Sequence, residues 1–232
     1  MLKGLIHFHS KYSFDCYTPV TELIKQSKKI GLNGFAITDH STISGVIEAK
    51  KINKDNNFII IVGCEITLDN GGEVLGLFLN ENIKSSSFYE VYDEIKDQDG
   101  VVILPHPFRS FKKNIEILNE KMLSKIKIIE GINSGNTPEE NQKAINLAKQ
   151  KGLIMTAGSD AHHFSGVGKA YTIFNNKDDD LKKQLIDGNI RIFGDTHNTW
   201  DRKREFFNRE LNSKNFKKIY KKTIDNFKRK IK

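Results

Sequence analysis

The 232-residue sequence has few of the features that mark secreted, membrane or dinucleotide-binding proteins. Its two cysteines, Cys16 and Cys64, are too few and too isolated for a disulfide framework. No apolar run approaches the length of a membrane span, and an apolar segment begins at Leu2, which leaves no room for a signal peptide. No G-x-G-x-x-G loop follows that segment. We therefore expect a cytoplasmic protein with no membrane partner and no dinucleotide fold.

Net positive charge is absent from most of the chain. The formal net charge is +8, but residues 200–232 contain 13 Lys and Arg against 4 Asp and Glu, so residues 1–199 sum to −1. Apolar residues in the tail recur at three- and four-residue steps, which predicts an amphipathic helix over residues 199–232. We expect this basic extension to pack on the preceding domain, residues 1–198. The alternative is a basic arm that binds nucleic acid.

Apolar, β-rich runs alternate with helical patterns along residues 1–198, which predicts an α/β fold with a mostly parallel sheet. An open sheet and a closed barrel both fit this alternation. Thr18 and Pro19 predict a helix start, with Thr18 as N-cap, and residues 69–72 predict a hairpin turn. Strands are expected at residues 2–6, 34–38, 58–62, 66–68, 73–78, 101–104, 126–129, 153–157, 171–174 and 190–193. Helices are expected at residues 19–31, 41–52, 88–96, 114–123 and 137–152, with one more between the last two strands.

Residues of metal-binding type follow several of these runs. His7 and His9 lie two positions apart and would share one face of a strand. Two solvent-facing histidines would give the same spacing, but similar residues follow other predicted strands. Because the carboxyl ends of parallel strands assemble the sites of barrels and open sheets, we expect these residues to meet. They are Asp39, His40, Glu65, His106, Asn133, Asp160 and His162.

The motifs His7-x-His9, Thr38-Asp39-His40, Pro105-His106-Pro107 and Gly158-Ser159-Asp160-Ala161-His162, together with Glu65, resemble those of the PHP (polymerase and histidinol phosphatase) superfamily. Their order and approximate spacing match from His7 to His162. The resemblance implies a distorted, TIM-like (β/α)7 barrel that binds two or three divalent metal ions. It also implies hydrolysis of phosphate mono- or diesters.

The resemblance further implies how the ligands are shared. The first ion would take His7, His9, Glu65 and Asp160; the second would share Glu65 and take His106; the third would take Asp15, His40 and His162. Imidazole and carboxylate ligands together suit Mn²⁺, Zn²⁺ or Fe²⁺. Glu73 stands where many relatives have a histidine, so it is either a ligand of the second ion or a surface glutamate. Asp15 without the resemblance would be read as a turn-capping residue.

Three further residues are candidates for other roles. Arg109, three residues beyond His106, is expected to donate to a phosphate, with a surface arginine as the alternative. His163 is a candidate proton donor to the leaving alcohol, or else a solvated histidine. His197 is expected to be structural, and Asn133 to line the site.

The leading hypothesis is a metal-dependent phosphatase or nucleotidase acting on a small phosphorylated substrate. A second hypothesis is a 5′–3′ exonuclease or phosphodiesterase on nucleic acid, aided by the basic tail. Histidinol phosphatase is a third, although no imidazole-binding pocket is identified. The non-enzymatic alternative is a metal-stabilised module, which the retained ligand set disfavours.

Overall fold

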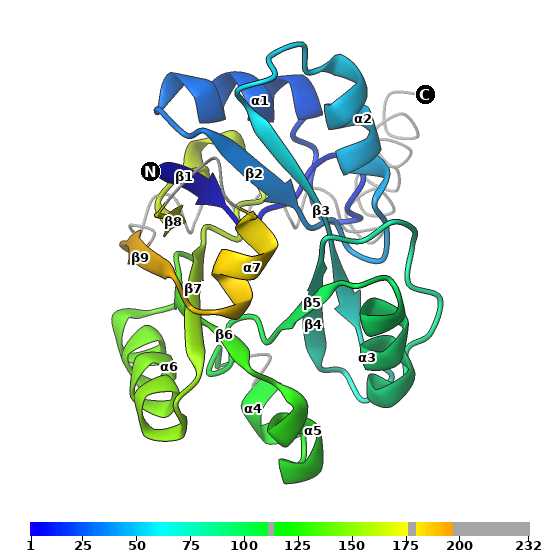
Figure 1. The fold of residues 1–232 in the computed structure, drawn as a ribbon, viewed down its shortest axis with the longest axis vertical. Helices are drawn as coiled ribbons and strands as arrows, with labels where there is room; N and C mark the ends of the chain where they lie inside the picture. The colour runs from blue at the N-terminus through cyan, green and yellow to red at the C-terminus, as the bar shows by residue number, and fades with distance from the viewer. Residues whose placement is uncertain (111–113, 176–179, 197–232) are drawn as a thin grey trace, which may run out of the picture.

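A computed structural model describes residues 1–110, 114–175 and 180–196 (Figure 1). The predicted tail helix and His197 lie outside these residues. No helix among the described residues is long and apolar enough to cross a membrane. The strands are β1 (Leu2–Leu5), β2 (Gly34–Ile37), β3 (Ile59–Thr67), β4 (Glu73–Leu77), β5 (Val101–Ile103), β6 (Ile128–Asn133), β7 (Ile154–Gly158), β8 (Ala170–Phe174) and β9 (Ile190–Gly194). The α-helices are α1 (Val20–Lys29), α2 (Ser44–Ile52), α3 (Phe88–Asp97), α4 (Asn114–Ile117), α5 (Glu120–Lys125), α6 (Pro138–Lys151) and α7 (Leu181–Ile186), and a 3₁₀ turn η1 spans Phe164–Gly166.

The fold is mixed α/β, with a curled seven-stranded sheet in the order β5-β4-β3-β2-β1-β8-β9 and a parallel pair β6-β7. Single parallel bridges join the pair to the larger sheet on both sides, at Leu104 with Ile129 and at Phe8 with Ala161. The two sheets therefore curl toward each other as in a TIM-like barrel. An open, doubly wound sheet does not describe this arrangement.

The sheet is less regular than a simple β/α repeat. Strands β3 and β4 form the hairpin predicted from residues 69–72, so β4 runs antiparallel to both β3 and β5. Strand β8 pairs antiparallel with β1 and with β9. Since β4 starts at the edge where β3 ends, Glu73 at its first position lies near the carboxyl ends of the parallel strands.

Alternate residues of the strands face two different cores. Phe35 and Ile37 of β2 pack with Val46 of α2 on the outer face, while Ala36 packs inside with residues of β3, β4 and β5. This two-residue period separates an outer layer, covered by helices, from an apolar interior. Leu185 of α7 belongs to the interior cluster. This apolar interior fills the barrel beneath the polar residues that lie at the carboxyl ends of the parallel strands.

Several predicted boundaries were wrong. Helix α1 begins at Val20 with Pro19 in the capping position and no side-chain cap, so Thr18 is not the N-cap. Helix α2 begins at Ser44 instead of residue 41, because Ser41 has a left-handed backbone (φ 57°). Strand β3 continues through Glu65, whose backbone pairs with Leu75 of β4.

Two further boundaries differ around residues 114–133. The single helix expected at residues 114–123 is split into α4 and α5, because the Asn119 side chain accepts a hydrogen bond from the Met122 amide and caps a new helix. Strand β6 starts two residues later than predicted, since Ile126 still ends α5, and it extends to Asn133 through its pairing with β7.

Helix α6 has the clearest local stop and start signals. Thr137 accepts from the Glu140 amide while the Glu140 carboxylate accepts from the Thr137 amide, and Gly152 ends the helix with φ 63°. Replacing Thr137 by alanine should lower the free energy of unfolding by about 1 kcal/mol. Urea denaturation measures this change. The Thr137→Ser variant keeps the hydroxyl and should unfold like the parent; equal losses in both variants would contradict the capping role.

Candidate metal centre

The chain brings residues from separate strands to one polar cluster. His7 and His9 follow β1, His106 follows β5, and Asp160 follows β7. Hydrogen bonds from the His9 amide to the Ala161 carbonyl and from the Asp160 amide to the His7 carbonyl hold the β1 and β7 ends together. Phe8, between the two histidines, is buried in the outer apolar layer that the helices cover, so the side chains of His7 and His9 point the opposite way. The alternation of side chains on either side of Phe8, which forms a single bridge with Ala161, thus aims both imidazoles into the cluster.

The first group comprises His7, His9, Glu65 and Asp160, all buried, with potential ligand atoms within 4.8 Å of one another. His9 Nε2 lies 3.1 Å from Asp160 Oδ1 and 3.2 Å from Glu65 Oε2. His7 Nε2 lies 3.4 Å from each of the same two oxygens, and it is buried with no hydrogen-bond partner among the described residues. A buried ring nitrogen that faces carboxylates without bonding to them fits a divalent ion.

The second group comprises Glu65, Glu73 and His106. His106 Nε2 lies 3.2 Å from Glu65 Oε1 and 3.6 Å from Glu73 Oε2. Glu73 is only 2% exposed, so the surface-glutamate alternative is wrong. Glu65 belongs to the first and second groups, as a carboxylate that bridges two ions would.

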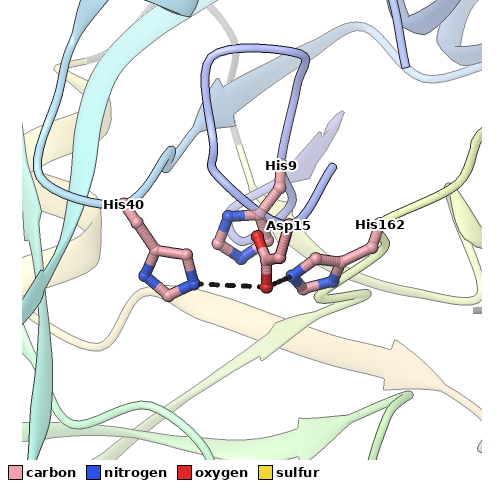
Figure 2. A group of neighbouring side chains, drawn as sticks. All are labelled: His9, Asp15, His40 and His162. Carbon is pink, nitrogen blue, oxygen red and sulfur yellow. Dashed lines mark ion pairs between the residues drawn. The ribbon is translucent and has the colours of Figure 1, made fainter. Parts of the chain in front are cut away.

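The third group comprises His9, Asp15, His40 and His162 (Figure 2). Asp15 points between two of the rings, with Oδ2 2.9 Å from His162 Nε2 and 3.7 Å from His40 Nε2. His162 Nδ1 lies 3.0 Å from the Asp160 carbonyl oxygen, which only accepts, so Nδ1 is the donor and Nε2 faces Asp15. All three groups contain only imidazole and carboxylate donors, which suit divalent transition metals.

Glu130, in the interior of β6, is a site residue that the sequence reasoning missed. Its carboxylate accepts from His7 Nδ1 at 3.0 Å, from the His106 amide at 3.0 Å and from Asn133 Nδ2 at 2.8 Å. A carboxylate behind a ligand imidazole fixes its tautomer and orientation. The available signal was a lone carboxylate inside the apolar run of residues 128–132.

Arg109 is buried instead of exposed. Its Nη1 lies 2.5 Å from Asp160 Oδ2, Nη2 donates to Asn133 Oδ1 at 2.7 Å, and Nε donates to Asn136 Oδ1 at 3.0 Å. The surface-arginine alternative is therefore wrong, and the guanidinium directly contacts an expected metal ligand. Asn133 lines the site, as expected.

His163 lies outside the three groups. Its Nδ1 contacts Ser165 Oγ at 2.8 Å and accepts from the Ser165 amide, which caps η1. It is half-buried beside His162. Neither cysteine joins a group: burial raises the pKa of Cys16 and of Cys64 to about 12, so both thiols are neutral at physiological pH.

Two cluster residues have unusual backbones. His106 and Asp160 have positive φ angles of 28° and 46°, which cost free energy in residues other than glycine. Such a conformation costs about 1–3 kcal/mol per residue, and it persists only where the surrounding structure enforces it. Here the His7 carbonyl and the Glu130 carboxylate hold the two amides.

A family model described as the PHP domain matches residues 6–230. This chain belongs to the PHP domain family. The protein MJ0417 of Methanocaldococcus jannaschii is 31% identical over 209 residues, which are 82% of this chain and 86% of that protein.

Solved structures share the PHP fold. A two-domain protein of Bacteroides vulgatus, described as containing a predicted PHP-like metal-dependent phosphoesterase, aligns with a TM-score of 0.71 at 20% identity, over 90% of this chain and 69% of that one. A lesion-specific endonuclease of Pyrococcus furiosus aligns with a TM-score of 0.64 at 16% identity, over 82% and 57% of the two chains. At these identities the likeness concerns the fold.

Opposite charges within the cluster shift the pKa values of its residues. Burial would lower the pKa of His9, but hydrogen bonds and charges of Asp160 and Glu65 outweigh it and raise that pKa to about 10. Burial would raise the pKa of Asp160, but Arg109 and the histidines hold it well below its usual range. In the absence of ions, His9 is therefore an imidazolium that pairs with Asp160 and Glu65.

Metal uptake should consequently release protons. A histidine must be neutral to bind a metal ion, and His9 is protonated at neutral pH in the ion-free cluster. Below a pKa of about 10, the apparent affinity for Mn²⁺ should rise by about tenfold per pH unit for each proton displaced. Calorimetric titrations in two buffers of different ionisation enthalpy count the protons released. An affinity independent of pH between about pH 6 and about pH 8, without proton release, would contradict this description.

Proposed function

We propose that this PHP domain hydrolyses phosphate monoesters of small molecules, as a phosphatase or nucleotidase that uses two or three Mn, Zn or Fe ions. The observation that carries the proposal is the shared Glu65 carboxylate, which places two groups of ligand-type atoms side by side. Divalent ions held there would supply Lewis-acid chemistry, by activating water at neutral pH and offsetting charge on the phosphate oxygens. Proposed ligands are His7, His9, Asp15, His40, Glu65, Glu73, His106, Asp160 and His162.

The chain's own residues would prepare this chemistry. Glu130 holds the proton on His7 Nδ1, which leaves Nε2 free to coordinate. Arg109 fixes Asp160 through its Nη1 contact, and its charge beside the cluster would attract a phosphate dianion. Direct phosphate binding by Arg109 would require one of its present contacts to be exchanged. His163, next to His162, would deliver a proton to the departing alcohol.

Removing a proposed ligand should abolish turnover. In His9→Ala and Asp160→Ala, hydrolysis of p-nitrophenyl phosphate with saturating Mn²⁺ should fall by roughly a thousandfold or more, because metal ions contribute several kcal/mol to such reactions. Asp187→Ala, at an exposed aspartate paired with Lys183, is the matched control and should retain full activity. Circular dichroism verifies folding. Full turnover in both ligand variants would remove this site from the reaction.

A nuclease or phosphodiesterase acting on nucleic acid is the second candidate. Residues 200–232, with 13 Lys and Arg against 4 Asp and Glu, carry a net charge of +9. The P. furiosus protein with the same fold is described as a lesion-specific endonuclease. Basic side chains near a nucleic acid bind its phosphates and make the affinity salt-dependent.

Neutralising part of the tail separates the two candidates. A variant with Lys217, Lys218, Lys221 and Lys222 changed to glutamine keeps the full chain. If a single-stranded nucleic acid is the substrate, salt should inhibit oligonucleotide hydrolysis less in the variant than in the parent. The slope of the logarithm of hydrolysis against the logarithm of salt concentration should become shallower by about 0.7 for each phosphate that the variant no longer neutralises. Hydrolysis of p-nitrophenyl phosphate should be unchanged. An unaltered salt slope on oligonucleotides would argue against the tail as a nucleic-acid arm.

A further inference from the structure

Exposed aromatic side chains concentrate beside the metal-binding groups. Two segments carry them: residues 12–17, which contain Asp15, and residue 164, which follows His162. Within the described part of the chain, four of the five exposed large aromatics lie in these two segments, and the fifth is on the edge strand β9. Scattered exposed apolar residues are ordinary, but a concentration at a site indicates a binding surface. The five are Tyr12, Phe14, Tyr17, Phe164 and Phe193.

Two of these rings line a surface pocket that adjoins the cluster. Its lining residues are Tyr17, Thr18, Pro19, His162, His163 and Phe164. His162 is also a member of the third group, in contact with Asp15. His162 is thus shared by the cluster and the pocket. A ligand whose phosphate lies at the cluster can therefore place the rest of its structure in this pocket.

The pocket walls are held in place. The Lys11 amide donates to the Thr18 carbonyl, which closes the loop that carries Tyr17. Cys16 Sγ lies 3.4 Å from the His9 carbonyl oxygen and 3.2 Å from the His162 carbonyl oxygen, and its single proton can be donated to either, which connects this loop to the opposite wall. On that wall, the His163 ring lies 4.1 Å from the Phe164 ring, centroid to centroid, and caps η1. Rigid aromatic walls lose little entropy when a flat ligand binds.

We propose that this pocket binds the nucleobase of a phosphorylated nucleoside, between Tyr17 and Phe164, while the ester phosphate lies at the three groups of proposed metal ligands. The inference deepens the proposed function by naming its substrate class. Aromatic side chains stack on every nucleobase. A free nucleotide and the terminal nucleotide of a single strand present the same base and phosphate, whereas a paired base inside a duplex is shielded by its neighbours.

The pocket has no carboxylate among its lining residues, so a positively charged group there would form no ion pair with the lining itself. A neutral nucleobase needs no such partner and stacks on the aromatic faces. Histidinol phosphate is therefore a discriminating comparison substrate.

The experiment compares an ester that has a base with one that lacks it. Adenosine 5′-monophosphate and ribose 5-phosphate share the sugar phosphate and differ in the base. In Tyr17→Leu and Phe164→Leu, kcat/KM for the nucleotide should fall by roughly 5- to 20-fold, mainly through KM, as expected when a ring that stacks on the base is removed. For ribose 5-phosphate it should stay within about twofold. Tyr17→Phe keeps the ring and should behave like the parent.

Phe193→Leu is the matched control, since Phe193 is also exposed (59%) but lies on β9, outside the pocket lining. Its kinetics on both substrates should equal those of the parent. A 5′-phosphorylated trinucleotide and its duplex form the second arm. Preference for the trinucleotide over the mononucleotide identifies a strand end as the source of the base, and preference for the mononucleotide identifies a free nucleotide.

Several outcomes would overturn the base subsite while leaving the phosphoesterase proposal intact. They are equal turnover of both sugar phosphates in the parent, unchanged nucleotide kinetics in both leucine variants, or preference for histidinol phosphate. Calorimetric binding of adenosine 5′-monophosphate to the Mn²⁺-loaded protein provides a readout without turnover. Absence of hydrolysis on all esters, with binding that is weakened in Tyr17→Leu, would refute the proposed function and support the base subsite. Absent or unweakened binding would refute the subsite in that case.

Discussion

The Glu65 carboxylate is the contact on which fold and site both depend. It is buried in β3, and its two oxygens lie within 3.2–3.5 Å of four imidazole nitrogens. A carboxylate taken out of water costs several kcal/mol unless opposite charges or hydrogen bonds compensate it. The compensating residues come from the ends of β1, β2 and β5, so the carboxylate is satisfied only when these strands are correctly placed. The four are His7, His9, His40 and His106.

Much of this arrangement was predictable because strand geometry is periodic. The His-x-His spacing predicts two side chains on one face, and the buried Phe8 between them confirms the alternation. Glu73 was ambiguous for a reason that also lies in strand geometry. Thr67 pairs with Glu73 across the hairpin, and Thr67 lies two residues beyond Glu65, so Glu73 shares the face of Glu65. That register depends on the length of the turn, which the sequence suggested without fixing.

Glu130 shows what sequence patterns alone do not provide. A carboxylate inside an apolar run interrupts a predicted strand, and nothing local indicates what it binds. Its partners, His7 and His106, are 123 and 24 positions away in the chain. The same packing explains Gly158, where an added Cβ would overlap Glu130 Oε1 and the His7 Cβ. The split of α4 from α5 has a local cause instead: a single capping residue, Asn119, starts a new helix within one apolar pattern.

The buried cluster and the aromatic rim beside it, which consists of the exposed residues Tyr12, Phe14, Tyr17 and Phe164, differ in what a substitution costs. In the cluster each charged group compensates others, as Arg109 does for Asp160, so replacing one leaves a buried charge unpaired and destabilises the fold. At the rim, Phe14 is 76% exposed and Tyr17 56%, so their replacement removes little packing. The Cys16 thiol connects residues 12–17 to the cluster through the His9 and His162 carbonyls, a contact that does not involve the exposed rings. Substitutions in the cluster therefore affect folding stability, whereas the exposed rings at the rim can be replaced at little cost to the fold.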